Sequence, residues 1–181
     1  IILTQNAIYQ ISNLQDQKNG DNKGISNVNL NKCEKKLRDE NHIEENEPLL
    51  IYKIDIRNQN SIQTYVQYEV YETKNYTLLN LSVCKDFTII VDTPVYLNDS
   101  LSSLYDSLKE SGYNLFNIND DFYNDICSTY TTENKTDISL TDRKNIIYEN
   151  NGKIELCQNG CELDYYNSTN KKAKCNCNPQ T

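Results

Sequence analysis

Apolar and polar residues alternate with a period of two between residues 49 and 91 of the chain. Successive side chains of a β-strand point to opposite faces, so this period is typical of strands that bury one face. Asn-rich turns separate the alternating segments, which together predict an antiparallel sheet or small sandwich. The predicted strands are Leu49–Ile56, with Tyr52, Ile54 and Ile56 on one face, Thr64–Tyr71, with Tyr65 opposite Val66, Tyr68 and Val70, Thr77–Val83, and Phe87–Val91, an apolar run expected to be buried on both faces.

Apolar residues at helical spacing predict three short helices. Capping residues with short polar side chains, which accept hydrogen bonds from unpaired N–H groups, precede two of them, and Gly112 follows the second. The predicted helices are Lys32–His42, Ser100–Ser111, capped by Asp99 or Ser100, and Leu140–Glu149, capped by Thr141.

The N-terminal segment Ile1–Leu14 is rich in Ile and favours an extended strand. The polar stretch Gln15–Asn31 follows it and is typical of a turn or linker. Such a strand is either an ordinary edge strand or one that inserts into a neighbouring subunit, because an unpaired sheet edge recruits strands. Its candidate assembly residues are Ile2, Ile8 and Ile11.

Composition narrows the function classes. The chain of 181 residues has a formal net charge of -8, a single His and 14 Tyr. Nucleic acids and anionic membranes require clustered Lys and Arg, so we expect neither as a partner. The sequence contains no run of about 20 apolar residues that could span a bilayer. The chain begins without a signal-like leader, so we expect any signal or anchor to lie elsewhere in a longer polypeptide.

Seven cysteines favour an oxidising compartment, where they would form disulfides. Seven is odd, so one thiol is free or pairs with a neighbouring module. Cys33 with Cys84 is a plausible long-range pair, whereas the pairing of the other five stays open. Four C-terminal thiols could instead bind zinc, a reading that the compartment disfavours. The cysteines are Cys33, Cys84, Cys127, Cys157, Cys161, Cys175 and Cys177.

Five acceptor triplets for N-linked glycans point to the same compartment, although an Asn-rich chain also produces such triplets by chance. N-linked glycans are the only non-protein groups that we expect, and we expect no cofactor. The acceptor residues are Asn75, Asn80, Asn98, Asn134 and Asn167.

Several sequence strings together resemble a known module. They are CEKKL, PLLIYKIDI, VQYEVY, LNLSVC, FYNDICSTYTTENKTDISLTDRKN, LCQNGC and YYNSTNKKAKCNC. Residues 30–177 resemble a cysteine-rich module repeated in large surface proteins of protists, especially ciliates, and the stretch 122–145 is its most specific part. The resemblance implies an extracellular, disulfide-bonded, glycosylated module without a known catalytic activity.

Other candidate chemistry is weaker. Asn119, Asp120, Asp121 and Asp125 supply oxygen ligands of the kind that calcium prefers, but the glycine and closing Glu of a calcium loop are absent, so a helix cap or solvated loop is favoured. We expect His42 on the surface, and Asp137, Asp142 and Arg143 to hold a loop by charge-assisted hydrogen bonds. Glycosidases use a pair of carboxylates, and the sequence does not single out any such pair among its acidic residues. Tyr65, Tyr68 and Tyr71 could form a carbohydrate-stacking face, though strand packing is the default.

The sequence therefore predicts a mainly β extracellular module with short helices, divided into residues 1–29 (strand and linker), 30–118 (β-rich domain) and 119–181 (disulfide-rich subdomain). We expect no enzymatic activity and no catalytic or metal-binding residues. The predicted function is structural: a repeat of a surface coat or filament that contacts other copies through strand exchange or sheet edges. The alternative is an adhesin or lectin-like binding module. If Ile1–Leu14 folds back on its own sheet beside an open pocket, the binding alternative gains.

Overall fold

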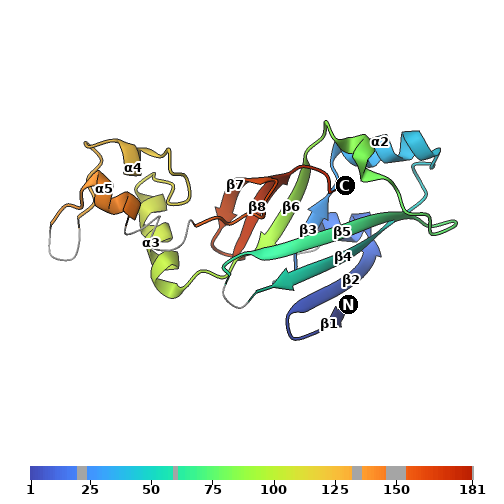
Figure 1. Ribbon diagram of the computed structural model, residues 1–181, viewed down its shortest axis with the longest axis horizontal. Helices are drawn as coiled ribbons and strands as arrows, with labels where there is room; N and C mark the ends of the chain where they lie inside the picture. The colour runs from blue at the N-terminus through green and yellow to red at the C-terminus, as the bar shows by residue number, and fades with distance from the viewer. Residues whose placement is uncertain (20–23, 59–60, 132–135, 146–153, 181) are drawn as a thin grey trace. The chain divides into compact units, whose positions relative to one another are not determined.

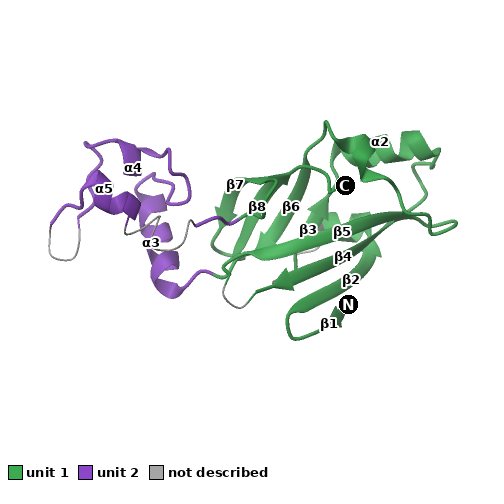
Figure 2. Ribbon diagram, in the orientation of Figure 1, with its two compact units in different colours: residues 1–96, 157–181 green, residues 97–156 purple. Residues whose placement is uncertain are grey.

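A computed structural model describes residues 1–19, 24–58, 61–131, 136–145 and 154–180 (Figure 1). The chain divides into two compact units: residues 1–96 with 157–181 form unit 1, and residues 97–156 form unit 2 (Figure 2). These units differ from the predicted segments 1–29, 30–118 and 119–181. The C-terminal residues belong with the N-terminal ones because their last strand pairs with a strand that ends at Pro94.

Sheet A of unit 1 is antiparallel, with the strand order β1-β2-β4-β5. Strand β2 pairs with β4 along its whole length, from Ala7 opposite Ile56 to Asn13 opposite Leu50. The N-terminal segment therefore folds back on its own sheet as a hairpin. The strands are β1 (Ile2–Leu3), β2 (Ala7–Asn13), β4 (Leu49–Arg57) and β5 (Thr64–Glu72).

One face of sheet A is buried and the other is open. In β5 the side chains of Val66, Tyr68 and Val70 are buried and that of Tyr65 is exposed, which confirms the predicted alternation. In β4 the buried side chains are those of Leu49, Ile51, Lys53 and Asp55. The predicted face of Tyr52, Ile54 and Ile56 is thus the outer face, where these residues are only half-buried.

Sheet B of unit 1 is also antiparallel, with the order β3-β6-β8-β7. The expected strand Phe87–Val91 is present from Ile89, but its burial alternates, so it is not buried on both faces. Val28, Ile89, Val91 and Ala173 supply apolar core residues from this sheet. The strands are β3 (Asn27–Asn29), β6 (Ile89–Pro94), β7 (Cys161–Asn167) and β8 (Lys172–Cys177).

Three helices complete unit 1: α1 (Leu14–Asn19), α2 (Lys32–Asn41) and the 3-10 helix η1 (Leu81–Cys84). The expected helix near Lys32–His42 is confirmed. The expected strand Thr77–Val83 is wrong, because Asn80 accepts a hydrogen bond from the Ser82 N–H at 3.0 Å and starts a helical turn. That turn places Cys84 within bonding distance of Cys33 in α2.

Unit 2 contains α3 (Asp99–Glu110), α4 (Asp121–Asn124) and α5 (Leu140–Asp142). The helix caps are Asn98 for α3 and Ser139 for α5, one or two residues before the expected ones. Residues 146–149, the rest of the last expected helix, lie outside the described residues. The core is aromatic, with the rings of Tyr105 and Phe116 stacked at 4.9 Å.

The fold class follows the prediction: antiparallel sheets dominate, the helices are short, and two disulfides cross-link the C-terminal residues 157–177. The sheets lie in unit 1, and they position the candidate site.

Candidate functional site

The open face of sheet A carries an unusual number of apolar and aromatic side chains. Residues directly opposite one another on antiparallel strands share a face. Ile11 lies opposite Tyr52, Tyr9 opposite Ile54, and Ile2 opposite Tyr9, so these five residues line the outer face. Two neighbouring regions of this face differ in character, one aliphatic and one a mixed groove.

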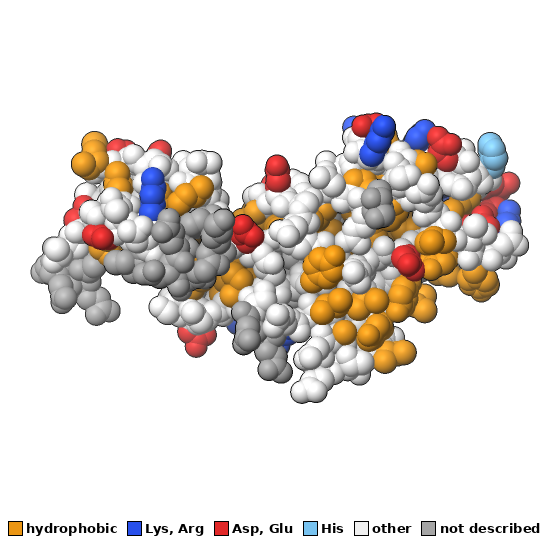
Figure 3. Space-filling model, viewed as in Figure 1, with side chains coloured by type: hydrophobic (Ala, Val, Ile, Leu, Met, Phe, Trp, Pro, Cys, Tyr) orange, Lys and Arg blue, Asp and Glu red, His pale blue; other side chains and the backbone are white. Residues whose placement is uncertain are grey.

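The aliphatic region, here called the hairpin patch, is formed by Ile2 and Ile11 on the outer face of the β1–β2 hairpin and by Ile1, which precedes Ile2 in the chain. Leu3 lies opposite Ile8, on the other face, and does not belong to it. The side chains of the patch are between 66% and 68% exposed, far more than is usual for large aliphatic residues. Figure 3 shows hydrophobic side chains gathered over the β1, β2 and β4 end of the molecule. A contiguous exposed patch of this kind is typical of an interaction surface.

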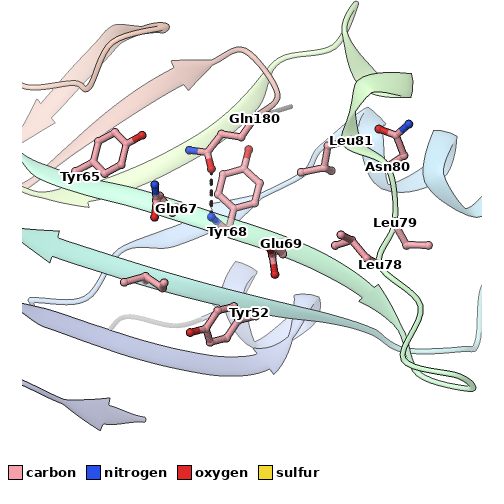
Figure 4. A pocket seen from close by; sticks show the side chains of 11 residues that line it. Tyr52, Tyr65, Gln67, Tyr68, Glu69, Leu78, Leu79, Asn80, Leu81 and Gln180 are labelled. Carbon is pink, nitrogen blue, oxygen red and sulfur yellow. Dashed lines mark hydrogen bonds between the residues drawn. The ribbon is translucent and has the colours of Figure 1, made fainter.

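The mixed region is a groove of about 700 Å³ beside β5, here called the β5 groove (Figure 4). Strands β4 and β5 supply one part of its lining, the segment before and within η1 another, and the C-terminal residues a third. The lining combines tyrosine rings, leucines and side-chain amides. Its lining residues are Tyr52, Ile54, Tyr65, Gln67, Tyr68, Glu69, Leu78, Leu79, Asn80, Leu81 and Gln180.

Two tyrosine hydroxyl groups of β5, of which only that of Tyr68 belongs to the groove lining, have shifted pKa values. Tyr71 donates a hydrogen bond to Glu69 at 2.5 Å, and this bond raises the pKa of the Tyr71 hydroxyl. Burial raises the pKa of the Tyr68 hydroxyl, and the nearby Gln180 backbone opposes this shift. Neither group is therefore suited to act as a base near neutral pH.

Glutamine side chains close the outer edge of β5. The Gln158 amide accepts from the Val66 N–H at 2.7 Å and donates to the Val66 carbonyl at 3.2 Å. The Gln180 amide accepts from the Tyr68 N–H at 3.2 Å and donates to the same Val66 carbonyl at 2.7 Å. These bonds occupy backbone groups that an added strand would need, so the structure does not favour assembly through this part of the edge.

A buried polar cluster that the sequence did not suggest lies under β4. Lys53 is fully buried and donates hydrogen bonds to the Ser26 carbonyl and, at 2.8 Å, to the Ser26 hydroxyl. Asp55 accepts from the N–H and the hydroxyl of Ser26 at 2.6 Å and 2.5 Å. Burial lowers the pKa of Lys53 to about 8, and the Asp55 carboxylate opposes this shift.

A serine beside a lysine of lowered pKa is a pair that can serve nucleophilic catalysis. Here Ser26 and Lys53 are 1% and 0% exposed, and the β5 groove is lined by other residues. Asp55 also engages the serine hydroxyl. We therefore interpret the cluster as a tie between β4 and the segment before β3.

The cysteines form three disulfides: Cys33–Cys84, Cys157–Cys175 and Cys161–Cys177. The first pair was expected, and the two C-terminal pairs contradict the zinc reading because all four sulfurs are bonded. Cys127 was counted among the disulfide residues, but it is an exposed free thiol in unit 2. Several disulfides suggest an oxidising, secreted or surface environment.

Four of the five glycan acceptors are in the described residues. Asn75, Asn80 and Asn98 are exposed and Asn167 is half-buried, whereas Asn134 lies outside the described residues. Asn80 and Asn98 each cap a helix through their side-chain oxygen. None of these four belongs to the β1–β2 hairpin.

The weaker candidates have structural roles. Asp120 caps α4 by accepting from the Phe122 N–H at 3.0 Å, as the cap reading expected, and His42 is exposed. Asp137 and Arg143 form an ion pair at 3.1 Å, and Arg143 also donates to the Ile138 carbonyl, which confirms their loop-holding role. Within the described ranges, no three His, Cys, Asp or Glu side chains are grouped to hold a metal ion.

The expected assembly residues Ile2, Ile8 and Ile11 do not share one surface. Ile2 and Ile11 point to the outer face, while Ile8 lies opposite Asp55 on the buried side of the sheet. Since the strand is paired within its own sheet, and the neighbouring strand β4 lines the β5 groove, insertion into a neighbour lacks support and the binding alternative gains. Of the expected tyrosine face, Tyr65 lines the groove from the outer face and Tyr68 is buried. Tyr52, which the sequence did not single out for binding, also lines the groove.

Comparisons with known proteins give no relative: no family model, curated protein or solved structure matches the chain. Across the described residues, no helix combines the length and apolarity that crossing a membrane requires.

Proposed function

We propose that this chain is a non-catalytic module of an extracellular surface protein and that it works by packing its hairpin patch against a neighbouring copy. The observation that carries the proposal is the exposure of Ile2 and Ile11, each more than 65% exposed on the outer face of a hairpin that is paired within its own sheet. Leaving such side chains in water is unfavourable, and a second apolar surface would remove them from it.

The contact differs from strand exchange. Strand β2 keeps all seven of its partners in β4, so a neighbour does not need to supply or take a strand. Packing of two hairpin patches across a two-fold axis is self-complementary, since each copy offers the same surface. The four described glycan acceptors lie outside the hairpin, which leaves the patch accessible if glycans are attached.

The compartment supports the proposal in two ways. Three disulfides need an oxidising environment, and the acceptor triplets need the same secretory route. A surface coat or filament made of repeated copies remains the context that we propose.

Sedimentation of the purified chain tests the proposal. We expect reversible association at concentrations up to about 1 mM, the range of weak contacts. Ile11→Asp should abolish it, because a charge on the patch would have to be desolvated. The control is Ile126→Asp, at an 81% exposed apolar residue in unit 2. A chain that stays monomeric throughout, or an Ile11→Asp variant that associates normally, would contradict the proposal.

A further inference from the structure

The β5 groove presents a row of side chains along two paired strands. On the outer face of β4 and β5, Tyr52 lies opposite Glu69, Ile54 opposite Gln67 and Ile56 opposite Tyr65. Tyr65 and Glu69 are four residues apart on one strand, a separation of about 13 Å. The row therefore holds a Tyr ring at each end, with Tyr65 46% exposed.

The chemistry of the lining excludes several ligand classes. Among the described residues that line the groove, Glu69 is the only charged one and none is Lys or Arg, so the lining does not complement an anion. An extended peptide would pair with a strand edge, but Gln158 and Gln180 occupy backbone groups of that edge. A metal ion would need more than one carboxylate.

The mixed lining fits a neutral ligand with both apolar faces and hydroxyl groups. Tyrosine rings offer flat apolar surfaces with a polar tip. The exposed Gln67 side chain can both donate and accept hydrogen bonds, and Glu69 accepts them. A sugar ring has the matching features: a face of C–H groups that packs on an aromatic ring, and equatorial hydroxyls that bond to amides and carboxylates.

We propose that the β5 groove binds a neutral oligosaccharide, which packs on Tyr65 and Tyr52 and hydrogen-bonds to Gln67 and Glu69 between them. The cavity of about 700 Å³ falls in the size range of small-molecule sites. This binding is a second function of unit 1, separate from the hairpin patch, and the two can fail independently because different side chains carry them.

A glycan attached to Asn80 would lie in the groove, because Asn80 is both a lining residue and a glycan acceptor. Its side-chain oxygen is held by the Ser82 N–H at 3.0 Å. The experiment therefore uses the natural chain beside Asn80→Gln, so that an attached glycan cannot hide the groove from an added saccharide.

The probes are cellotriose, maltotriose, mannotriose and triacetylchitotriose, with trigalacturonic acid as the anionic comparison. Saturation-transfer NMR detects contact, and titration calorimetry measures affinity. We expect at least one neutral probe to bind Asn80→Gln and Tyr65→Ala in that background to weaken binding about tenfold. Tyr76→Ala is the control, at a Tyr 70% exposed outside the groove lining.

Three results would overturn the proposal: no neutral probe binds, only trigalacturonic acid binds, or Tyr65→Ala binds as well as its parent. Thermal unfolding of each variant separates lost binding from lost fold. Tyr65 projects from the open face, so its replacement leaves the buried face of β5 intact.

Discussion

The side-chain amide of Gln158 bonds both backbone groups of Val66, accepting from its N–H at 2.7 Å and donating to its carbonyl at 3.2 Å. A side chain from the C-terminal region thus takes the place of a neighbouring strand at the edge of sheet A. The side-chain amide of Gln180 makes a similar pair of bonds next to it, accepting from the Tyr68 N–H and donating to the Val66 carbonyl. An open edge favours pairing between copies, and here these amides occupy the backbone groups that such pairing would need.

Removing the two amides should expose the edge. We expect the double variant Gln158→Ala/Gln180→Ala to aggregate, because Val66 and Tyr68 would present unpaired backbone groups. Light scattering and the weight-average mass during incubation measure this. Gln67→Ala is the matched control, since Gln67 lies on the same strand with an exposed side chain. If the double variant stays as monodisperse as Gln67→Ala, the amides do not protect the edge.

The buried ion pair under β4 should behave as a unit. Lys53 and Asp55 are both buried, 3.4 Å apart, and both bond to Ser26. Removing one partner leaves an uncompensated buried charge, which costs about 3–5 kcal/mol. We expect Lys53→Met and Asp55→Leu to lose that much unfolding free energy singly, and the double variant to lose much less than their sum. Urea unfolding of the four proteins measures the coupling, and additive losses would contradict it.

The lowered pKa of Lys53 makes a pH prediction. In the folded chain its pKa is about 8, below the ordinary value of 10.5, because burial penalises the ammonium. Between these values the unfolded chain binds the proton and the folded chain does not, so the unfolding free energy rises with pH. Below pH 8 both states carry the proton and this gain is absent.

Urea unfolding at about pH 7.5 and about pH 9.5 tests this sign. The natural chain should gain more stability over this interval than Lys53→Met/Asp55→Leu, in which the group is missing. Tyrosines titrate in both proteins and largely cancel in the comparison. An equal change in the two proteins would show that Lys53 does not titrate in this interval.

The sequence predicted features that depend on nearby residues better than those that depend on distant ones. The period of two in β5 identified its buried face, and the spacing in α2 its helix. Bonds between residues far apart have no such signal: Val66 and Gln158 are separated by 92 positions, and Ser26 and Asp55 by 29. In β4, Lys53 and Asp55 occupy buried positions that a pattern of apolar residues assigns to the surface.

The groove was only partly predictable for the same reason. Tyr65 was a candidate stacking residue from its strand position. Tyr52 joins it only through the register of β4 with β5, and Gln180 only because the C-terminal residues return to unit 1. The boundary predicted at residue 119 missed this return, because β6 and β8 pair although all of unit 2 lies between them in the sequence.

The Tyr68 hydroxyl should reduce stability. Its oxygen is buried and makes no hydrogen bond of ordinary geometry in the described part of the chain, although the Gln180 backbone lies close to it. A buried group left without a full hydrogen bond costs about 1–3 kcal/mol. We expect Tyr68→Phe to raise the unfolding free energy by about 1 kcal/mol, because the ring packing is kept and the unpaired hydroxyl is removed. Tyr65→Phe, at an exposed ring, is the control and should leave stability unchanged. A loss of stability in Tyr68→Phe would mean that the hydroxyl has a partner in solution, such as a bound water.

The disulfides should differ in what they contribute. A cross-link lowers the entropy of the unfolded chain, and the effect grows with the loop that it closes. Cys33–Cys84 spans 51 residues and Cys157–Cys175 spans 18. By this entropy model the first contributes about 4 kcal/mol and the second about 3 kcal/mol. We expect paired Ser replacements to lower the urea midpoint in that order.

The exposed thiol of Cys127 supplies the control for this series. Because it closes no loop, Cys127→Ser should change the unfolding free energy by less than about 0.5 kcal/mol. In the natural chain, a maleimide reagent should label Cys127 alone before reduction and all seven cysteines after reduction and unfolding. Labelling of a second cysteine before reduction would show that one of the three disulfides is not formed. A Cys127→Ser variant as unstable as a paired replacement would show that loop closure does not explain the losses.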